Sequence, residues 1–386
     1  MTERIVASFV PLVDCAVLVA AREQGFAAAE GFELELIKEP SWASLRDHLC
    51  LGHVDCAHAL APLPVALALG VGYLQVDCPV PFVLSRGGNA ITVAAGLFDE
   101  MQAAAGVLPV SRDPATAGRA LAAVARRRSA PLTFGMVFPF SNHNFELRYW
   151  LASAGLHPDR DVRLVAIPPP LMVETLRAGL VDGFCVGEPW NSLAVAQGLG
   201  CIVATQSQLF PRAVEKVLAV HAAIERTPER LTKLLRALSA AAAWADDSRH
   251  HASLAQHLAR PEYLGAPAHL IEAVLSGRLQ LGAGREMHDP DFIFFHRHAA
   301  NAPDVADGQW VYAQMVRWGQ VAPSARGQAL AAHAYRPDIY QRSVPSAPPC
   351  SSRLRAFDQI EFVADDIRSY LDQFEVHTPF NDARSG

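Results

Sequence analysis

Apolar and polar positions fall into alternating blocks over residues 131–191, and the blocks predict the order strand, helix, strand, helix, strand. Residues 132–138 form a short apolar run bounded by prolines, which is typical of a strand buried on both faces. Ser141 is a good N-cap, and an apolar stripe at helical spacing follows it as far as Gly155. His143 therefore falls in the first turn of a helix, where unpaired backbone N–H groups and the helix dipole favour a small anion.

The second half of this stretch repeats the pattern. The sequence predicts a strand at 162–167, a helix at 171–178 and a further strand at 181–186. Glu188 follows at the carboxyl end of the last strand, which is the edge at which open α/β sheets bind ligands. Two βα units with polar residues at their strand ends indicate one wall of a ligand site.

The rest of the chain predicts further βα units. Residues 78–85 are expected to be an extended crossover, and residues 201–205 are expected to carry the chain back to a strand at 216–220. After residue 228 the chain is mostly helical in pattern. The other predicted strands are 5–11, 32–36, 54–60 and 90–93, and the other predicted helices are 15–29, 41–51, 62–69, 94–128, 229–246, 250–258, 267–275, 309–320 and 365–374.

These elements predict an α/β fold of two lobes. Lobe I comprises residues 1–88 and 206–340, lobe II comprises 89–205, and residues 341–386 form a C-terminal extension that packs back on a lobe. A lobe inserted through two crossovers is typical of binding proteins that close around a ligand. We therefore expect the ligand in the cleft between the lobes.

Composition narrows the classes of partner. The 386 residues suffice for two lobes with cores of their own, and a net charge of −6 speaks against nucleic acid as a direct partner. No run of about 18 apolar residues predicts a membrane span. The first residues resemble a short signal sequence, but Pro11 and Asp14 interrupt its apolar part, and the same segment forms the first predicted strand and helix. We therefore expect a cytoplasmic protein, in which the seven scattered cysteines are reduced thiols.

Other polar groups suggest neither a metal site nor an enzyme. Two cysteines and two histidines have the spacing of a zinc site, but they straddle a predicted helix end, a turn and a strand, which would scatter them. The paired histidines at 250–251, and those at 296 and 298, are expected to be solvated. No nucleophile elbow, phosphate loop or HExxH motif is present, so we expect no catalysis and no cofactor. The four zinc-like residues are Cys50, His53, Cys56 and His58.

The chain carries a series of short phrases, namely Pro11-Leu12-Val13-Asp14-Cys15-Ala16, Glu39-Pro40-Ser41-Trp42, Asp55-Cys56-Ala57-His58, Gly88-Asn89-Ala90-Ile91-Thr92, Ser141-Asn142-His143-Asn144, Arg148-Tyr149-Trp150-Leu151, Pro168-Pro169-Pro170, Cys185-Val186-Gly187-Glu188-Pro189-Trp190-Asn191, Pro211, Glu215-Lys216-Val217 and Gln314-Met315-Val316-Arg317-Trp318-Gly319-Gln320. In this order and spacing they resemble the nitrate- and bicarbonate-binding family of type II periplasmic-binding folds, the NrtA/CmpA group. Within that family the chain resembles the cytoplasmic NasS-type nitrate/nitrite sensors.

The resemblance implies a pocket for nitrate or nitrite. Its residues in this sequence would be Trp42 as a wall with Ser41 beside it, Gly88 and Asn89, His143, Lys216, and Pro169 and Glu188 at the pocket edge. His143 and Lys216 stand where bicarbonate binders of the family have acidic and amide residues around calcium, so they point away from bicarbonate and from metal.

The chemistry of a nitrate site agrees with these residue types. Nitrate is a planar monoanion that needs N–H donors, one compensating cation and a dry wall. Lys216 would supply the charge, His143 and Asn89 the donors, and Trp42 the wall. Because a carboxylate next to the anion would repel it, we expect Glu188 to orient His143 or Lys216 instead of touching the ligand.

The resemblance also implies a function. A NasS-type protein would hold an ANTAR-type RNA-binding antiterminator, a NasT-like protein, when it is free of ligand, and would release it when nitrate or nitrite closes the cleft. Two alternatives remain open. One is the solute-binding component of a nitrate or bicarbonate importer, and the other is an enzyme similar to the thiamine-pyrimidine synthases, which share the fold class but carry a cysteine-rich motif that this sequence lacks.

Overall fold

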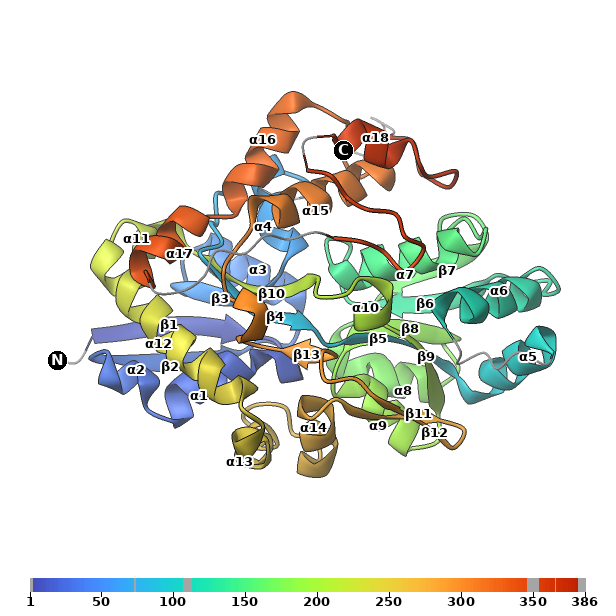
Figure 1. The fold of residues 1–386 in the computed structure, drawn as a ribbon, viewed down its shortest axis with the longest axis horizontal. Coiled ribbons are helices and arrows are strands. Elements are labelled where there is room, and N and C mark those ends of the chain that lie inside the picture. Colours follow the sequence, from blue (N-terminus) through green and yellow to red (C-terminus); the bar gives the residue numbers. More distant parts are fainter. Residues whose placement is uncertain (1–2, 73, 107–112, 346–353, 365, 381–386) are drawn as a thin grey trace.

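The computed structural model describes residues 3–72, 74–106, 113–345, 354–364 and 366–380, which form two large sheets flanked by helices and one two-stranded sheet (Figure 1). The first sheet has the strand order β13-β4-β10-β3-β1-β2, and the second has the order β7-β6-β8-β5-β9. The strands of the first sheet are β1 (Glu3–Phe9), β2 (Phe32–Lys38), β3 (Cys56–Leu60), β4 (Phe82–Gly87), β10 (Val214–Val220) and β13 (Ile293–Phe294). Those of the second are β5 (Asn89–Ala94), β6 (Leu132–Met136), β7 (Val162–Ala166), β8 (Gly183–Gly187) and β9 (Gly200–Thr205).

Both large sheets mix parallel and antiparallel strands. In the first, β1 runs parallel to β2 and β3, while β10 runs antiparallel to β3 and β4. In the second, β6 runs parallel to β7 and β8, while β5 runs antiparallel to β8 and β9. Strands β3, β5, β8, β9 and β10 are buried almost throughout, and most of their residues are accordingly apolar. Each large sheet is therefore the centre of one lobe.

The helices pack on the faces of the sheets and, at one edge, between the lobes (Figure 1). The segment predicted as one helix at 15–29 is broken instead, because Gly25 adopts a φ of 76°. The helices are α1 (Ala16–Glu23), α2 (Phe26–Ala29), α3 (Trp42–Cys50), α4 (Pro62–Leu69), α5 (Ala95–Ala105), α6 (Pro114–Ala125), α7 (Asn142–Ser153), α8 (Met172–Arg177), α9 (Trp190–Ala196), α10 (Gln206–Leu209), α11 (Ala222–Glu225), α12 (Pro228–Asp246), α13 (His251–Leu258), α14 (Ala268–Leu275), α15 (Val305–Arg317), α16 (Ala325–Ala334), α17 (Pro337–Ser343) and α18 (Ile367–Leu371).

The chain crosses between the lobes at two places, and both differ from the sequence-based expectation. Residues 78–85 were expected to be an extended crossover, but Phe82–Gly87 is strand β4 of the first sheet. Residues 201–205 were expected to lead back to the first lobe, but they lie in β9, which pairs with β5 in the second sheet. The crossovers are shorter: one turns at Gly87 and Gly88, and the other runs from α10 to β10.

The first crossover is enclosed by a segment from much later in the chain. Gly87 and Gly88 have φ values of 73° and 99°, and the Gly88 N–H donates to the Phe292 carbonyl at 2.7 Å. A Cβ on Gly87 would lie 2.2 Å from that same carbonyl oxygen. The next two residues, Ile293 and Phe294, form β13 and pair with β4. Only glycine fits this turn, because a side chain would meet both backbone strain and the later segment.

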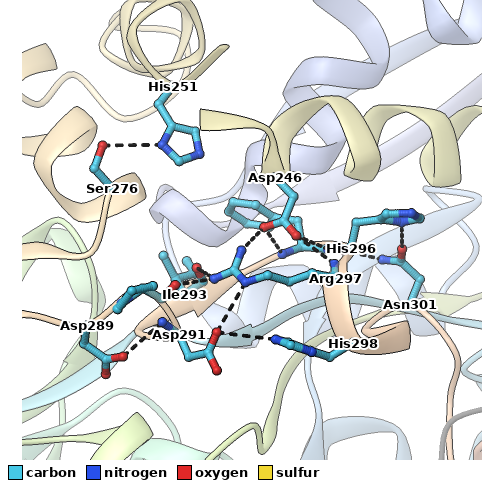
Figure 2. Close-up of polar contacts among 12 residues, drawn as sticks. Asp246, His251, Ser276, Asp289, Asp291, Ile293, His296, Arg297, His298 and Asn301 are labelled. Carbon is cyan, nitrogen blue, oxygen red and sulfur yellow. Dashed lines mark hydrogen bonds and ion pairs between the residues drawn. The ribbon is translucent and has the colours of Figure 1, made fainter. Parts of the chain in front are cut away.

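Ionic contacts hold the same segment in place (Figure 2). Asp291 Oδ1 accepts from Arg297 Nε at 3.3 Å, and Asp291 Oδ2 lies 3.4 Å from Nη2 of Arg212, which belongs to the second crossover. Arg297 also donates to Asp246 at the end of α12. The Asp291 carboxylate therefore joins this segment to the second crossover. The backbone of the same segment contacts the first crossover through the Phe292 carbonyl.

The histidines that the sequence analysis expected to be solvated behave differently from one another (Figure 2). The His298 imidazole is 40% exposed and lies 3.6 Å from Asp291. His251 is buried, with Nδ1 3.4 Å from Ser276 Oγ, so the prediction is wrong for this residue. His296 is exposed as predicted, and its Nδ1 lies 2.9 Å from Asn301 Oδ1. Within the ranges that the structure describes, no group of His, Cys, Asp and Glu side chains is arranged to hold a metal ion.

A β-hairpin that was not predicted from the sequence contacts the second lobe. Strands β11 (Arg278–Gly282) and β12 (Arg285–His288) follow α14, and β11 packs against α9 and β9. Arg285 donates to the Ile202 carbonyl at 3.2 Å, and its guanidinium carbon lies 4.4 Å from the Phe98 ring centroid. The hairpin was missed because its strands are short, and only one of the five residues of β11, Leu279, is buried.

The C-terminal extension contacts both lobes, where the sequence analysis expected it to pack on one. The Phe357 N–H donates to the Leu209 carbonyl at 2.9 Å, and the Asp358 carboxylate accepts from the Tyr149 hydroxyl of α7 at 2.9 Å. The Thr378 N–H donates to the carbonyl of Arg317 in α15. Residues 354–364 and 366–380 therefore cross the outer edge of the lobe interface (Figure 1). No helix of the described ranges is long and apolar enough to cross a bilayer, and the six cysteines they contain are free thiols, while Cys350 lies outside them.

Candidate functional site

Lys216 lies at the centre of a buried polar cluster between the lobes. Its side chain has no exposed surface, because β10 is a central strand of the first sheet with β3 and β4 on either side. The ammonium Nζ lies 2.8 Å from Asp14 Oδ2 and 2.7 Å from Glu215 Oε1. A lysine is almost never fully buried unless it is paired, and here two carboxylates pair it.

A bulge brings Glu215 and Lys216 to the same place. Neighbouring residues of a regular strand point to opposite faces of the sheet. The pairing of β10 with β4 shifts register on both sides of Lys216, between Val214 and Lys216 and again before Val217. An irregularity of this kind turns a side chain out of the regular alternation. Glu215 therefore meets the ammonium of the adjacent residue, with Oε2 also accepting from Gln206 Nε2 at 3.3 Å.

Trp42 and His58 complete the side of the cluster that belongs to the first lobe. Ser41 caps α3, because its Oγ accepts from the Ser44 N–H at 3.2 Å, and so Trp42 begins the helix facing the cluster. Lys216 Nζ lies 5.6 Å from the centroid of the buried Trp42 ring. His58 packs against the same indole at 5.9 Å, with Nε2 2.8 Å from Asp14 Oδ1.

The second lobe contributes the first turns of α7. The Ser141 Oγ accepts from the Asn144 N–H at 3.1 Å, which is the N-cap that the sequence predicted. His143 is fully buried in the first turn, with Nδ1 3.6 Å from Glu215 Oε1 across the lobe interface. Asn142 also crosses the interface and donates to the Val214 carbonyl at 2.5 Å. The start of α7 is therefore docked directly on β10.

Asn89 faces a carboxyl group in place of an open donor position. Its Nδ2 lies 3.2 Å and 3.4 Å from the two oxygens of Glu146, and the Cys185 thiol lies 3.8 Å from the same carboxyl. The sequence analysis expected the Asn89 amide to donate to the ligand. In the structure Asn89 Nδ2 donates to Glu146, one helical turn after His143, and a contact of Asn89 with the ligand stays a prediction.

Burial sets the protonation of the cluster. Burial would raise the pKa of Asp14, but Lys216 and His58 outweigh it and hold the pKa at about 2. Burial would lower the pKa of Lys216, but Asp14 and Glu215 outweigh it and raise that pKa. Burial and the nearby Lys216 charge lower the pKa of His143 well below its usual value. At neutral pH Asp14 and Lys216 are therefore charged and His143 is neutral.

The two glutamates titrate in the opposite direction to Asp14. Burial, and then the neighbouring Glu215, raise the pKa of Glu146 well above its usual value, which favours the protonated form of this carboxyl. Burial raises the pKa of Glu215 as well, although the contact with Lys216 opposes the rise. The cluster thus contains one permanent cation, Lys216, and more carboxyl groups than it can neutralise.

Several buried polar atoms of the cluster have no hydrogen-bond partner within the described part of the chain. They include Trp42 Nε1 and both ring nitrogens of His143, together with Asn89 Oδ1 and Asn142 Oδ1. Buried donors are nearly always satisfied in folded proteins. Donors on Trp42 and His143, next to a lysine ammonium and the start of a helix, suit a small oxyanion that accepts several hydrogen bonds.

The remaining residues predicted for the pocket have structural roles. Gly88 forms the crossover, and Pro169 begins the 3-10 turn η3 (Pro169–Leu171) in front of α8. Glu188 was expected to orient His143 or Lys216, and this is wrong: its Oε2 accepts from the Ser192 N–H at 3.0 Å and caps α9. Burial raises the pKa of Glu188 to about 7. Its backbone carbonyl accepts from the Val13 N–H at 2.8 Å and so links the lobes.

Four polar residues of the cluster were missed as site residues: Asp14, His58, Glu146 and Glu215. Glu146 had a sequence signal, since it lies three residues after His143 and shares its helix face. Asp14 and His58 had none, because their contact joins β3 to the 3-10 turn η1 (Val13–Cys15) across the sheet. His58, one of the four residues with zinc-like spacing, therefore pairs with Asp14 instead.

The fold and the enclosed polar cluster define a two-lobed ligand-binding protein. Residues 2–259 match the NMT1-like family. The crystal structure of the periplasmic nitrate-binding protein NrtA from Synechocystis superposes with a TM-score of 0.87 at 26% identity, covering 97% of this chain and 99% of that one. The predicted periplasmic-binding-protein fold is therefore confirmed.

Two curated relatives define the family further. The nitrate/nitrite binding protein NrtA of Synechocystis is 30% identical over 389 residues, which cover 95% of this chain and 84% of that protein. The nitrate import ATP-binding protein NrtC of the same organism is 35% identical over 381 residues, or 96% of this chain and 55% of that protein. The chain thus spans about half the length of the latter relative. It belongs to the NMT1-like family and, within it, to the NrtA/CmpA group.

Proposed function

We propose that this protein binds nitrate or nitrite between its lobes. The observation that carries the proposal is the closed cluster around Lys216, in which the ring nitrogens of Trp42 and His143 are buried beside an ammonium group and lack hydrogen-bond partners in the described ranges. A planar monoanion would accept from these donors, and the Trp42 ring would keep water out. The names of the NrtA relatives support the same ligand.

The role that the relatives favour is the solute-binding component of a nitrate importer. NrtA is named as a nitrate/nitrite binding protein, and this chain covers most of its length. In that role the closed form would deliver the anion to a membrane partner, and the lobes would open to release it. An importer requires only that the partner prefer the closed, loaded form.

A second role is a cytoplasmic sensor that controls a NasT-like ANTAR antiterminator. It is the role that the resemblance to the NasS-type sensors implies, and the match to about half of NrtC, which is named as a nitrate import ATP-binding protein, supports nitrate as the ligand in either role. In a sensor, ligand would favour the closed lobes over the form that holds the RNA-binding partner.

Thermal unfolding in the presence of different anions tests the ligand. Nitrate or nitrite at 100 times its Kd is expected to add about 2.7 kcal/mol to the free energy of unfolding, because it binds only the folded, closed chain. Sulfate, and bicarbonate with calcium, serve as controls and are expected to add nothing. A shift with bicarbonate and calcium but none with nitrate or nitrite would show that the proposal is wrong. Gel filtration with a NasT-like regulator, with and without nitrate, then separates the sensor from the importer component.

A further inference from the structure

We propose that the anion enters this site together with a proton, which the Glu215–His143 pair takes up. The inference rests on the proposed function and deepens it, because it makes one proton part of the ligand that the cluster accepts. Glu215 thereby becomes a binding residue that sets the pH at which the protein can hold a monoanion.

Charge and burial in the cluster carry this inference. The group that would face the anion most directly, Lys216, is already neutralised by Asp14 at 2.8 Å, and Glu215 adds a second carboxyl at 2.7 Å. Water cannot compensate an excess charge here, since every titratable side chain of the cluster is at most 2% exposed. The titratable groups that face one another are Asp14 from η1, His58 from β3, His143 and Glu146 from α7, Cys185 from β8, and Glu215 and Lys216 from β10.

An added anion would therefore meet a surplus of negative charge. With Glu215 ionised, the empty cluster is already net negative, and a monoanion on Lys216 would place two uncompensated negative charges in a dry site. Uncompensated buried charge costs several kcal/mol, and proteins commonly avoid it by changing protonation. One proton taken up with the anion removes the excess charge that the anion brings.

Geometry selects the pair that receives the proton. Glu215 Oε1 is shared between Lys216 Nζ at 2.7 Å and His143 Nδ1 at 3.6 Å, so a proton can reside on either the carboxyl or the imidazole. Glu215 and His143 both lie next to the position proposed for the anion. The negative charge of the anion would favour the protonated form of each group.

The other groups of the cluster are less suited to this role. Asp14 keeps its charge, since its pKa is held at about 2 by Lys216 and His58 against the effect of burial. Burial and Glu215 raise the pKa of Glu146 well above the usual value, which favours its protonated form before the anion arrives. Burial likewise raises the pKa of the Cys185 thiol well above its usual value, so it stays protonated. Asp14 lies between His58 and the position proposed for the anion, and its Oδ1 contacts His58 Nε2 at 2.8 Å.

The proton balance fixes the sign of the pH dependence. At a pH above the raised pKa of Glu215, the free site holds this group as a carboxylate, and the loaded site holds the anion with one extra proton on Glu215 or His143. No bond of the anion is made or broken. Because the loaded state binds more protons than the free state, the affinity must fall as the pH rises, by up to about tenfold per pH unit. The decline begins above the raised pKa of Glu215 in the free protein.

Calorimetric titration of the intact protein with nitrate tests the inference. Between about pH 5.5 and 8.5, the wild type is expected to lose up to about tenfold in affinity per pH unit. Titrations in phosphate and in Tris, which differ in ionisation enthalpy, should show close to one proton taken up per anion. Glu215→Gln is expected to bind with an affinity that changes less than about twofold over the same range, and to bind more tightly than the wild type at the alkaline end.

Glu146→Gln is the matched control, because glutamine imitates the protonated carboxyl that the raised pKa of Glu146 favours. Whatever its absolute affinity, its slope against pH is expected to follow that of the wild type. Nitrate binding by the wild type without pH dependence and without proton uptake would overturn the inference and leave the proposed function intact. A wild-type slope in Glu215→Gln would equally overturn it. Absence of nitrate binding at every pH would overturn the proposed function itself, and with it the inference.

Discussion

Replacing Lys216 with methionine is expected to abolish nitrate binding and to lower the free energy of unfolding by about 3–5 kcal/mol. Methionine preserves most of the buried volume but removes the charge that pairs with Asp14 at 2.8 Å and Glu215 at 2.7 Å. Two carboxyl groups would then be left buried without their cation. Calorimetry measures the lost binding, and urea unfolding measures the lost stability.

Lys233→Met provides the control for that experiment. Lys233 pairs with Glu3 at 3.1 Å, but its side chain is 38% exposed, so the loss of this surface pair is expected to cost no more than about 1 kcal/mol. Its nitrate affinity should match that of the wild type. If Lys216→Met still bound nitrate with wild-type affinity, the cluster around Lys216 could not be the anion site.

Replacing Gly87 with alanine is expected to cost about 3 kcal/mol or more of stability. The new methyl group would lie 2.2 Å from the Phe292 carbonyl oxygen, and the residue would keep a φ of 73°. The segment that encloses the crossover would have to move, and β13 would lose its register with β4. Chemical denaturation with both lobes monitored, for example by tryptophan fluorescence and far-ultraviolet circular dichroism, would reveal the loss.

Gly25→Ala separates backbone strain from the steric clash. Gly25 has a φ of 76°, but a Cβ there would have no neighbour within 4 Å. Alanine at this position is expected to cost only about 1–2 kcal/mol, since it pays for the left-handed conformation alone. Equal losses in the two variants would mean that the contact between Phe292 and the crossover contributes nothing.

The local features of the site could be predicted from the sequence, whereas its electrostatics could not. Ser141 caps α7 and places His143 in the first turn, as the pattern of capping and apolar residues indicates. The carboxylate partners of Lys216 could not be predicted from the sequence, for a physical reason. Glu215 meets its neighbour only because a bulge interrupts the alternation of β10, and nothing in the local sequence marks that bulge.

The crossovers show a similar limit. Gly87 and Gly88 form the first crossover, but the need for glycine at position 87 comes from Phe292, about 200 residues later in the chain. A long-range contact also determines the position of the Asn89 side chain, because its amide donates to Glu146, 57 residues later in the chain. Helices with strong apolar periodicity, such as α12 at Pro228–Asp246, agreed with their predicted bounds because their pattern is set locally.

A crystal structure of the protein grown with nitrate would show whether the anion binds in the cluster around Lys216. We expect one planar anion in the closed cleft, within hydrogen-bond distance of Lys216 Nζ, a ring nitrogen of His143 and Trp42 Nε1. We also expect Glu215 to be turned toward His143. Density for the anion elsewhere on the surface, or a cleft that stays closed around the Asp14–Lys216–Glu215 contacts with no anion bound, would contradict it.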